Sequence, residues 1–180
     1  MSETKGKNIL LVYKDQSSFV KHDIQLLSNH FEVKDYYIQA SKKVFPFLWS
    51  HLKLGFYILT HKKDIDIIYT WFGDYHAFTA GLFAKMLNKK HVIIIGGNDA
   101  VAIPQIGYGV FAKKNMRAKL VKKAYVMATK LLVVDPSLIK SENRYSGDNN
   151  IVGVENILPG LKTKCEVIPT GYNAAKWKCK

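Results

Sequence analysis

HVIIIGGND, at residues 91–99, contains the clearest strand pattern in the chain. Val92–Ile95 are four consecutive β-branched residues without polar alternation, which is typical of a strand covered on both faces of a parallel sheet. Two glycines then allow a tight turn close to a ligand, and an Asn and an Asp supply a donor and an acceptor. Ligands of open α/β sheets bind at this end of the strands, so the sequence predicts a binding loop, with an ordinary turn as the alternative. The residues concerned are Gly96, Gly97, Asn98 and Asp99.

The composition predicts a globular domain with an anionic partner. The length of 180 residues suits one domain with a full core, and 48% hydrophobic and 12% aromatic residues exclude a disordered chain. Lys and Arg number 27 against 14 Asp and Glu, and the formal charge of +13 favours nucleic acid, an anionic membrane or a phosphorylated substrate. Cys165 and Cys179 are too few for a disulfide framework and lack zinc-site spacing. Because the N-terminus also lacks a signal-peptide pattern, we expect a reducing, cytoplasmic location.

Strand and helix patterns alternate along the chain. This alternation predicts an α/β, Rossmann-like fold, which is an open, mostly parallel sheet with helices on both faces. The turn KDQSS after the first strand lacks GxGxxG, which argues against a dinucleotide site. A polar loop is expected at residues 143–153. The other expected strands are at residues 8–13, 31–38 (near the sheet edge), 64–70, 131–134 and 165–168, and the helices at 18–30, 77–87 and 112–128.

KKVFPFLWSHLKLGFYILTHKK, at residues 42–63, is an aromatic-rich apolar segment with a lysine pair at each end. Its polar centre and its short length argue against a membrane-spanning helix. We expect a crossover helix whose apolar face covers the sheet, because parallel strands need such connections. A second interpretation adds contact with an anionic membrane surface. The residues for that contact are the aromatic residues Phe45, Phe47, Trp49 and Phe56 and the flanking lysines Lys42, Lys43, Lys62 and Lys63.

The helix expected at residues 112–128 carries three more lysines, Lys119, Lys122 and Lys123. The pattern places them on the side opposite an apolar stripe. A solvated face is the default interpretation of such lysines, and phosphate or lipid contact is the alternative. The expected stripe consists of Met116, Leu120, Ala124 and Met127.

Two further loops contain candidate ligand contacts. In WFGDYH, which follows the strand at 64–70, Trp71, Asp74 and His76 combine an aromatic ring, an acid and an imidazole that suit a sugar or similar ring. The alternative places Trp71 in the core and His76 at a helix start. IPQIGYG, at residues 103–109, is a glycine-rich loop long enough to form a pocket rim with Tyr108.

Several of these segments together resemble the N-terminal half of family 4 glycosyltransferases of the GT-B fold. They are NILLVY, DIIYTWFGDYHAFTAGLFAKMLNKKHVIIIGGNDA, IPQIGYGVF, KLLVVDPSLIK and CEVIPTGYN, which cover most of the chain. The resemblance implies that residues 1–170 form an acceptor-side domain and that 171–180 begin the linker to a C-terminal donor-binding domain. That second domain is not in this sequence. It would bind a UDP- or GDP-sugar, so no cofactor and no metal are expected in this half.

The resemblance implies transfer of a sugar to an acceptor hydroxyl in the cleft between the two domains, with retention of configuration. Many family members carry a histidine where this chain has Asn98 and Asp99. The residues that match the acceptor side, with the loop candidates named above, are Asp15, Ser17, Ser18, Trp71, Asp74, His76, Gly96, Gly97, Asn98, Asp99 and Tyr108.

The leading hypothesis is therefore the acceptor-binding half of a glycosyltransferase, inactive without its donor-binding domain or subunit. The basic charge and the segment at residues 42–63 point to a lipid-linked acceptor and a peripheral place on the inner face of the cell membrane. The alternative is a non-enzymatic basic α/β module for nucleic acid or another anionic partner. The chain carries no nucleic-acid-binding signature, and its lysines are scattered, so nucleic acid is the weaker choice.

Overall fold

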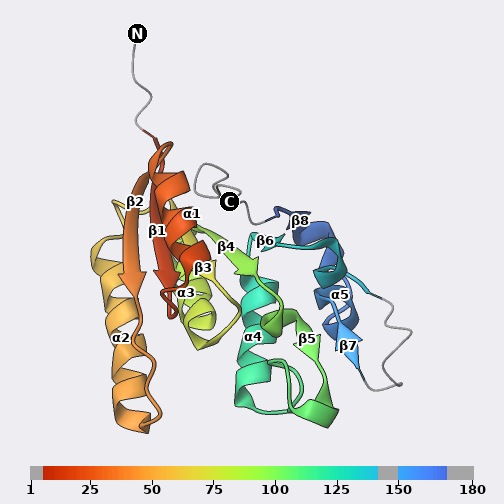
Figure 1. Ribbon diagram of the computed structural model, residues 1–180. Coiled ribbons are helices and arrows are strands. Elements are labelled where there is room, and N and C mark those ends of the chain that lie inside the picture. Colours follow the sequence, from red (N-terminus) through yellow and green to blue (C-terminus); the bar gives the residue numbers. More distant parts are fainter. Residues whose placement is uncertain (1–5, 142–149, 170–180) are drawn as a thin grey trace, which may run out of the picture.

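The computed structural model describes residues 6–141 and 150–169, and its main feature is a six-stranded sheet whose neighbouring strands all pair in parallel (Figure 1). The strand order is β2-β1-β3-β4-β6-β8. The α/β, Rossmann-like fold expected from the alternating pattern is thus confirmed. The strands are β1 (Asn8–Tyr13), β2 (Glu32–Tyr37), β3 (Ile67–Trp71), β4 (Lys90–Ile95), β6 (Lys130–Val133) and β8 (Cys165–Val167).

The strand order contains one switch point, between β1 and β3. From β1 the chain moves to β2 on one side and then returns to β3 on the other side. The loops that follow β1 and β3 therefore lead to opposite sides of the switch point. The space at the carboxyl ends of these two strands is not crossed by a connection. Ligands of doubly wound sheets bind at such a place.

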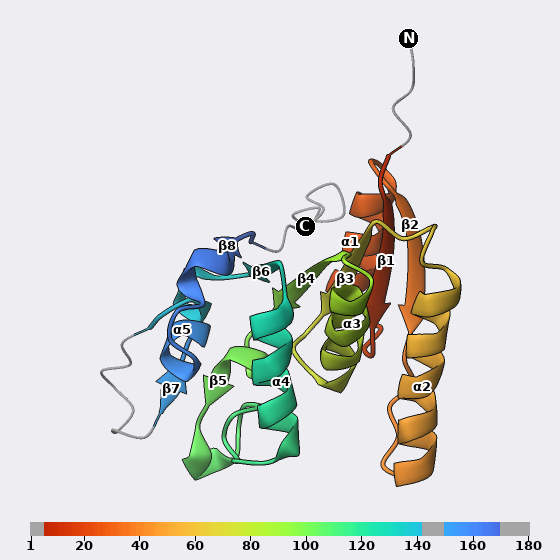
Figure 2. The ribbon, with the colours of Figure 1, turned by 180° about the vertical axis from the view of Figure 1, so that it is seen from behind.

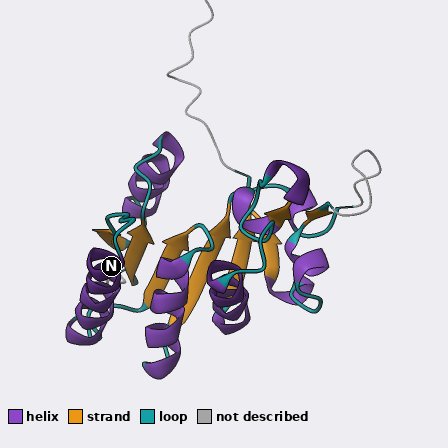
Figure 3. Cartoon of the chain, turned by 90° about the horizontal axis from the view of Figure 1, so that it is seen from below, coloured by secondary structure: helices purple, strands orange, loops and turns teal. Residues whose placement is uncertain are grey.

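Helices cover both faces of the sheet (Figures 2 and 3). One face carries α2 (Val44–Thr60), α3 (Tyr75–Met86) and α4 (Met116–Met127), which lie side by side, and the other carries α1 (Ser18–Ser28). Strand β4 shows how the faces alternate, because Ile93 and Ile95 pack with α3 and α4 whereas Ile94 packs with Val20 of α1. All three isoleucines are buried, as the run at residues 92–95 predicted.

Most expected elements are present with shifted ends. Helix α3 begins at Tyr75 and not at Ala77, because the Asp74 carboxylate accepts the Tyr75 N–H and caps the helix. Helix α4 begins at Met116 and not at Ala112, because the Asn115 side chain accepts the Ala118 N–H at 3.0 Å.

The apolar stripe expected on α4 was only partly right, because Ala124 is buried as expected whereas Leu120 and Met127 are half-buried. Met116 is 63% exposed, and apart from Ala124 the buried residues of α4 lie one or two positions further along the chain than the expected ones. The buried residues are Ala118, Val121, Ala124 and Tyr125. The lysines are nevertheless outside this buried side, since Lys119 and Lys123 are exposed and Lys122 is half-buried with its Nζ 5.9 Å from the Phe111 ring centroid.

Short elements beside β6 and β8 were not expected. The chain forms β5 (Val101–Ala102) and β7 (Ile151–Val152), which pair antiparallel, and a single turn α5 (Val154–Ile157). The end of the polar loop predicted at residues 143–153 is therefore ordered as β7, while residues 143–149 lie outside the described part. The predicted linker at 171–180 also lies outside it.

The helices of the described residues include none long and apolar enough to cross a bilayer. Helix α2 occupies most of the segment for which a crossover helix was expected, and it packs against α3.

Candidate functional site

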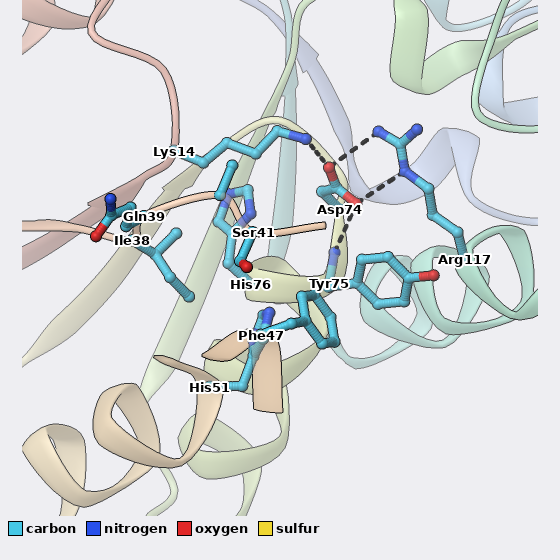
Figure 4. A pocket seen from close by; sticks show the side chains of 11 residues that line it. Lys14, Ile38, Gln39, Ser41, Phe47, His51, Asp74, Tyr75, His76 and Arg117 are labelled. Carbon is cyan, nitrogen blue, oxygen red and sulfur yellow. Dashed lines mark hydrogen bonds and ion pairs between the residues drawn. The ribbon is translucent and has the colours of Figure 1, made fainter. Parts of the chain in front are cut away.

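Three charged side chains meet at the switch point of the sheet (Figure 4). Lys14 follows β1, Asp74 precedes α3, and Arg117 lies in the first turn of α4. The Arg117 Nε and Nη2 groups donate to Asp74 Oδ1 and Oδ2, each at 2.9 Å, and Lys14 Nζ donates to Oδ2. We call these three residues the charged cluster.

The charged cluster carries more positive than negative charge. Asp74 is only 4% exposed and is held by both cations, whereas about a third of the Lys14 and Arg117 side chains remains open to solvent. Burial, with a contribution from the nearby Arg117 charge, lowers the pKa of Lys14 to about 8. At neutral pH two cations and one carboxylate leave one net positive charge within the cluster, which suits the binding of an anionic group on the side away from Asp15 and Asp99.

Two cavities flank the charged cluster, and all three of its residues line both. The first has a volume of about 260 Å³ and lies against α2, where Phe47 and His51 form part of its wall (Figure 4). The second has a volume of about 220 Å³ and is bounded by the loops after β1, β3 and β4. Asp15, Asn98 and Asp99 are among its lining residues. A ligand with an anionic centre and groups on either side would fit this arrangement.

Two neutral histidines belong to the first cavity. His76 Nε2 lies 2.8 Å from the Trp71 carbonyl oxygen and must carry the proton, because a carbonyl only accepts. His51 Nδ1 lies 2.9 Å from Thr79 Oγ1, whose own proton is directed to the Tyr75 carbonyl, so Nδ1 donates here. Burial lowers the pKa of His76 to about 3 and also lowers the pKa of His51. Both imidazoles therefore offer a lone pair on their second nitrogen.

Asp99 anchors the loops that form the second cavity. Its Oδ2 accepts the Gly73 N–H at 2.7 Å, and its Oδ1 accepts the N–H groups of Gly96 and Gly97 at 3.1 Å. Its backbone oxygen accepts the Tyr125 hydroxyl at 2.7 Å. An added Cβ at Gly73 would overlap that hydroxyl, which explains the glycine. Although these N–H groups favour the carboxylate, burial raises the pKa of Asp99.

The other predicted acceptor residues are spread over several environments. Asp15 and Asn98 are exposed and line the second cavity, which they share with the charged cluster. Trp71 is 1% exposed, packs on Phe19 and donates its Nε1–H to Asp23 at 3.0 Å, so its ring lies in the core and is closed to a sugar.

Ser17, Ser18 and Tyr108 line neither cavity. Ser17 is the N-cap residue of α1, but its Oγ is buried without a hydrogen-bond partner among the described residues and makes no capping bond. Ser18 is exposed as the first residue of α1. Tyr108 is 45% exposed and bridges to Ile103 within its own loop.

Sequence reasoning missed Lys14 and Arg117. One signal was available for Arg117, because it is one of two arginines among the 27 basic residues. A chain that otherwise uses lysine needs arginine where two parallel N–H donors must meet a carboxylate or phosphate. Lys14 directly follows a buried strand at the end where ligands bind, and that position alone made it a candidate.

The lysines predicted for lipid or phosphate contact lie elsewhere. Lys119 and Lys122 line a separate cavity of about 320 Å³ beside Phe111, and Lys123 is exposed on α4. Lys42 and Lys43 precede α2, and Lys62 and Lys63 follow it, all exposed. The described residues contain no group of three or more His, Cys, Asp or Glu side chains placed to hold a metal ion.

Comparison with solved structures supports the fold. A protein of Listeria monocytogenes described as a UDP-N-acetylglucosamine 2-epimerase matches with a TM-score of 0.50 and 10% identity, over 73% of this chain and 39% of the other. A Sinorhizobium meliloti protein described as a glycerol dehydrogenase matches with a TM-score of 0.32, 16% identity and coverages of 54% and 24%. A cysteine desulfurase of Thermococcus onnurineus matches with a TM-score of 0.33 and 13% identity, over 51% of this chain and 23% of the other.

The match to the epimerase shows a GT-B-like, Rossmann-like fold for this chain, which spans 39% of that protein's length. The other two likenesses are too slight to carry an argument. No protein-family model matches the chain, and no curated protein sequence matches it either.

Proposed function

We propose that this chain is the acceptor-binding half of a nucleotide-sugar-dependent glycosyltransferase of the family 4 type. The observation that carries the proposal is the charged cluster with a cavity on each side at the switch point of a GT-B-like sheet. Resemblance of the loops and of CEVIPTGYN to that family supports it, as does the matched Listeria protein, whose description names a UDP-sugar. The reaction is transfer of a sugar to a hydroxyl of the acceptor.

The charged cluster supports an acceptor that carries a phosphate or another anionic group. The open sides of Lys14 and Arg117 would hold a phosphate or another anionic group, because a guanidinium and an ammonium pair well with its oxygens. Asp15 and Asn98 of the second cavity would orient the acceptor hydroxyl. A lipid-linked sugar phosphate has both features.

The proton of that hydroxyl does not go to His76 in this proposal. A pKa of about 3 leaves the imidazole a hydrogen-bond acceptor and a very weak base at neutral pH. Asp74 and Asp99 are already held by their hydrogen bonds. In this proposal the donor side of the cleft supplies the proton acceptor, and the residues of this half, Asp15 included, bind and orient the acceptor.

The donor, a UDP- or GDP-sugar, would bind to a second Rossmann-like domain or subunit outside these 180 residues. The match covers 39% of the Listeria protein, which is compatible with a further domain or subunit. We expect no sugar transfer by this chain alone, and transfer of labelled sugar from UDP- or GDP-sugars once it is joined to its donor-binding half. The measurement is the amount of labelled product formed on lipid-linked and on soluble acceptors. Transfer by the isolated chain, or none by the assembled protein, would refute the proposal.

A further inference from the structure

Helix α2 has an apolar side that no other part of the described chain covers. Its inner side is in the core, with Leu54 and Ile58 fully buried and Gly55 in close contact with the Phe83 ring of α3. Its outer side presents large apolar side chains that are 52–79% exposed, and we call them the α2 stripe. They are Val44, Phe45, Leu48, Trp49, Leu52 and Phe56.

The place of α2 in the fold leaves this stripe open. It is the outermost helix of its layer, with α3 as its neighbour on the inner side (Figure 2). A hollow of about 690 Å³ runs along the stripe, where Trp49 and Phe56 meet Tyr36 and Tyr57. Exposed apolar surface of this extent marks an interaction site in a folded domain.

Lysines frame the α2 stripe. Between Asp35 and Asp64 the chain has five lysines and no acidic residue. Lys42 and Lys43 adjoin the N-terminus of α2, where positive charge opposes the helix dipole, so helix stability does not explain them. Midway along the helix, the Lys53 Nζ lies 5.6 Å from the Trp49 ring centroid. Cations therefore lie at both ends and in the middle of the apolar surface.

We propose that α2 docks the protein on an anionic lipid bilayer, with the α2 stripe among the upper acyl chains and the lysines on the lipid phosphates. Helices that lie in the membrane interface combine these two features. The hollow beside Trp49 and Phe56 suits an acyl chain.

The pattern of charge favours a membrane over other occupants. A second copy docked symmetrically through the same stripe would bring the two sets of lysines together, and like charges repel. Nucleic acid would use the lysines but would leave the aliphatic residues Val44, Leu48 and Leu52 in water. An anionic bilayer satisfies both kinds of side chain.

Docking by α2 would bring the charged cluster near the lipid surface. Phe47 and His51 of the same helix line the cavity of about 260 Å³. The proposal stands on the surface of α2 and is independent of the chemistry at the cluster, so it can fail or succeed without the proposed transferase function.

Vesicle sedimentation tests the proposal. The full chain should bind vesicles of phosphatidylcholine with phosphatidylglycerol, and weakly those of phosphatidylcholine alone. Combined Phe45→Ser, Trp49→Ser and Phe56→Ser should weaken binding roughly tenfold or more. Leu26→Ser is the matched control, because Leu26 is 52% exposed on α1, on the opposite face of the sheet, and should bind as wild type. Circular dichroism confirms that each variant is folded.

Substitution of the lysines that flank α2 provides a second test of the proposal. Changing Lys42, Lys43, Lys62 and Lys63 to Gln should weaken binding to the anionic vesicles roughly tenfold or more, whereas Lys21→Gln on α1 should have little effect. Three results would overturn the proposal. These are no binding by the wild type, equal binding by the stripe variant, or a lipid-free dimer that the stripe substitutions dissociate.

Discussion

An Asp99→Ala variant is expected to unfold with a free energy about 3 kcal/mol lower than that of the wild type. The carboxylate is 2% exposed and accepts three backbone N–H groups, those of Gly73, Gly96 and Gly97. The alanine leaves these donors without partners, and each unsatisfied buried donor costs roughly 1–3 kcal/mol. Because water partly reaches Gly96 and Gly97, we expect the total cost of the three lost hydrogen bonds to lie near the lower end of that range. Urea unfolding followed by circular dichroism measures the change.

Two matched variants distinguish the loss of the Asp99 hydrogen bonds from the loss of a single helix-capping hydrogen bond. Asn115→Ala removes one accepted N–H bond, that of Ala118 at the start of α4, and should cost about 1 kcal/mol. Asp99→Asn keeps one acceptor oxygen but turns an amide donor toward another donor, so its stability should lie between wild type and Asp99→Ala. If Asp99→Ala is no less stable than Asn115→Ala, Asp99 does not hold the loops together.

Arg117→Ala is expected to lower kcat/KM for sugar transfer roughly hundredfold in the protein that carries the donor-binding half. The substitution removes the two N–H donors that hold Asp74 and one of the two cations that face the cavities. Lys14 then neutralises Asp74 alone, and no net positive charge remains for an anionic acceptor. Initial rates at several acceptor concentrations give the value.

The controls for Arg117→Ala lie on the same residue and the same helix. Arg117→Lys keeps the charge but cannot make both bonds to Asp74, so it should recover only part of the activity. Lys123→Ala removes one exposed cation from α4 away from both cavities and should leave the rate unchanged. Wild-type activity in Arg117→Ala, or an equal loss in Lys123→Ala, would show that the cluster has no specific role.

The main sheet was predictable because its strands are strongly patterned. Ile93, Ile94 and Ile95 are buried on both faces, which leaves an unbroken apolar run in the sequence. The alternation at residues 31–38 correctly indicated a strand near the sheet edge, since β2 pairs with β1 alone among the described strands. Strands β5 and β7 have two residues each, too few for any period to show, and they form only because the chain brings them together.

The site was only partly predictable, because it depends on which helix ends meet. Asp74 was predicted as a loop residue beside a ligand, but its partners are Lys14 directly after β1 and Arg117 in α4, 60 and 43 residues away. The prediction placed Met116 on the buried side of α4, and for this reason it also missed Arg117, which lies between exposed Met116 and buried Ala118. Trp71 could not be assigned to core or pocket from its loop, because that choice depends on Phe19 and Asp23 of α1.

Titration of the isotope-labelled chain with sulfate, followed by amide NMR shifts, tests most directly whether the charged cluster is the anion site. Sulfate keeps a constant charge near neutral pH, so any pH effect belongs to the protein. We predict shifts around Lys14, Asp74 and Arg117 that weaken as pH rises through about 8, because Lys14 then loses its proton. In Lys14→Arg the response should persist above that pH. Shifts confined to α2 or to the lysines of α4, or shifts unchanged in Arg117→Ala, would contradict the account.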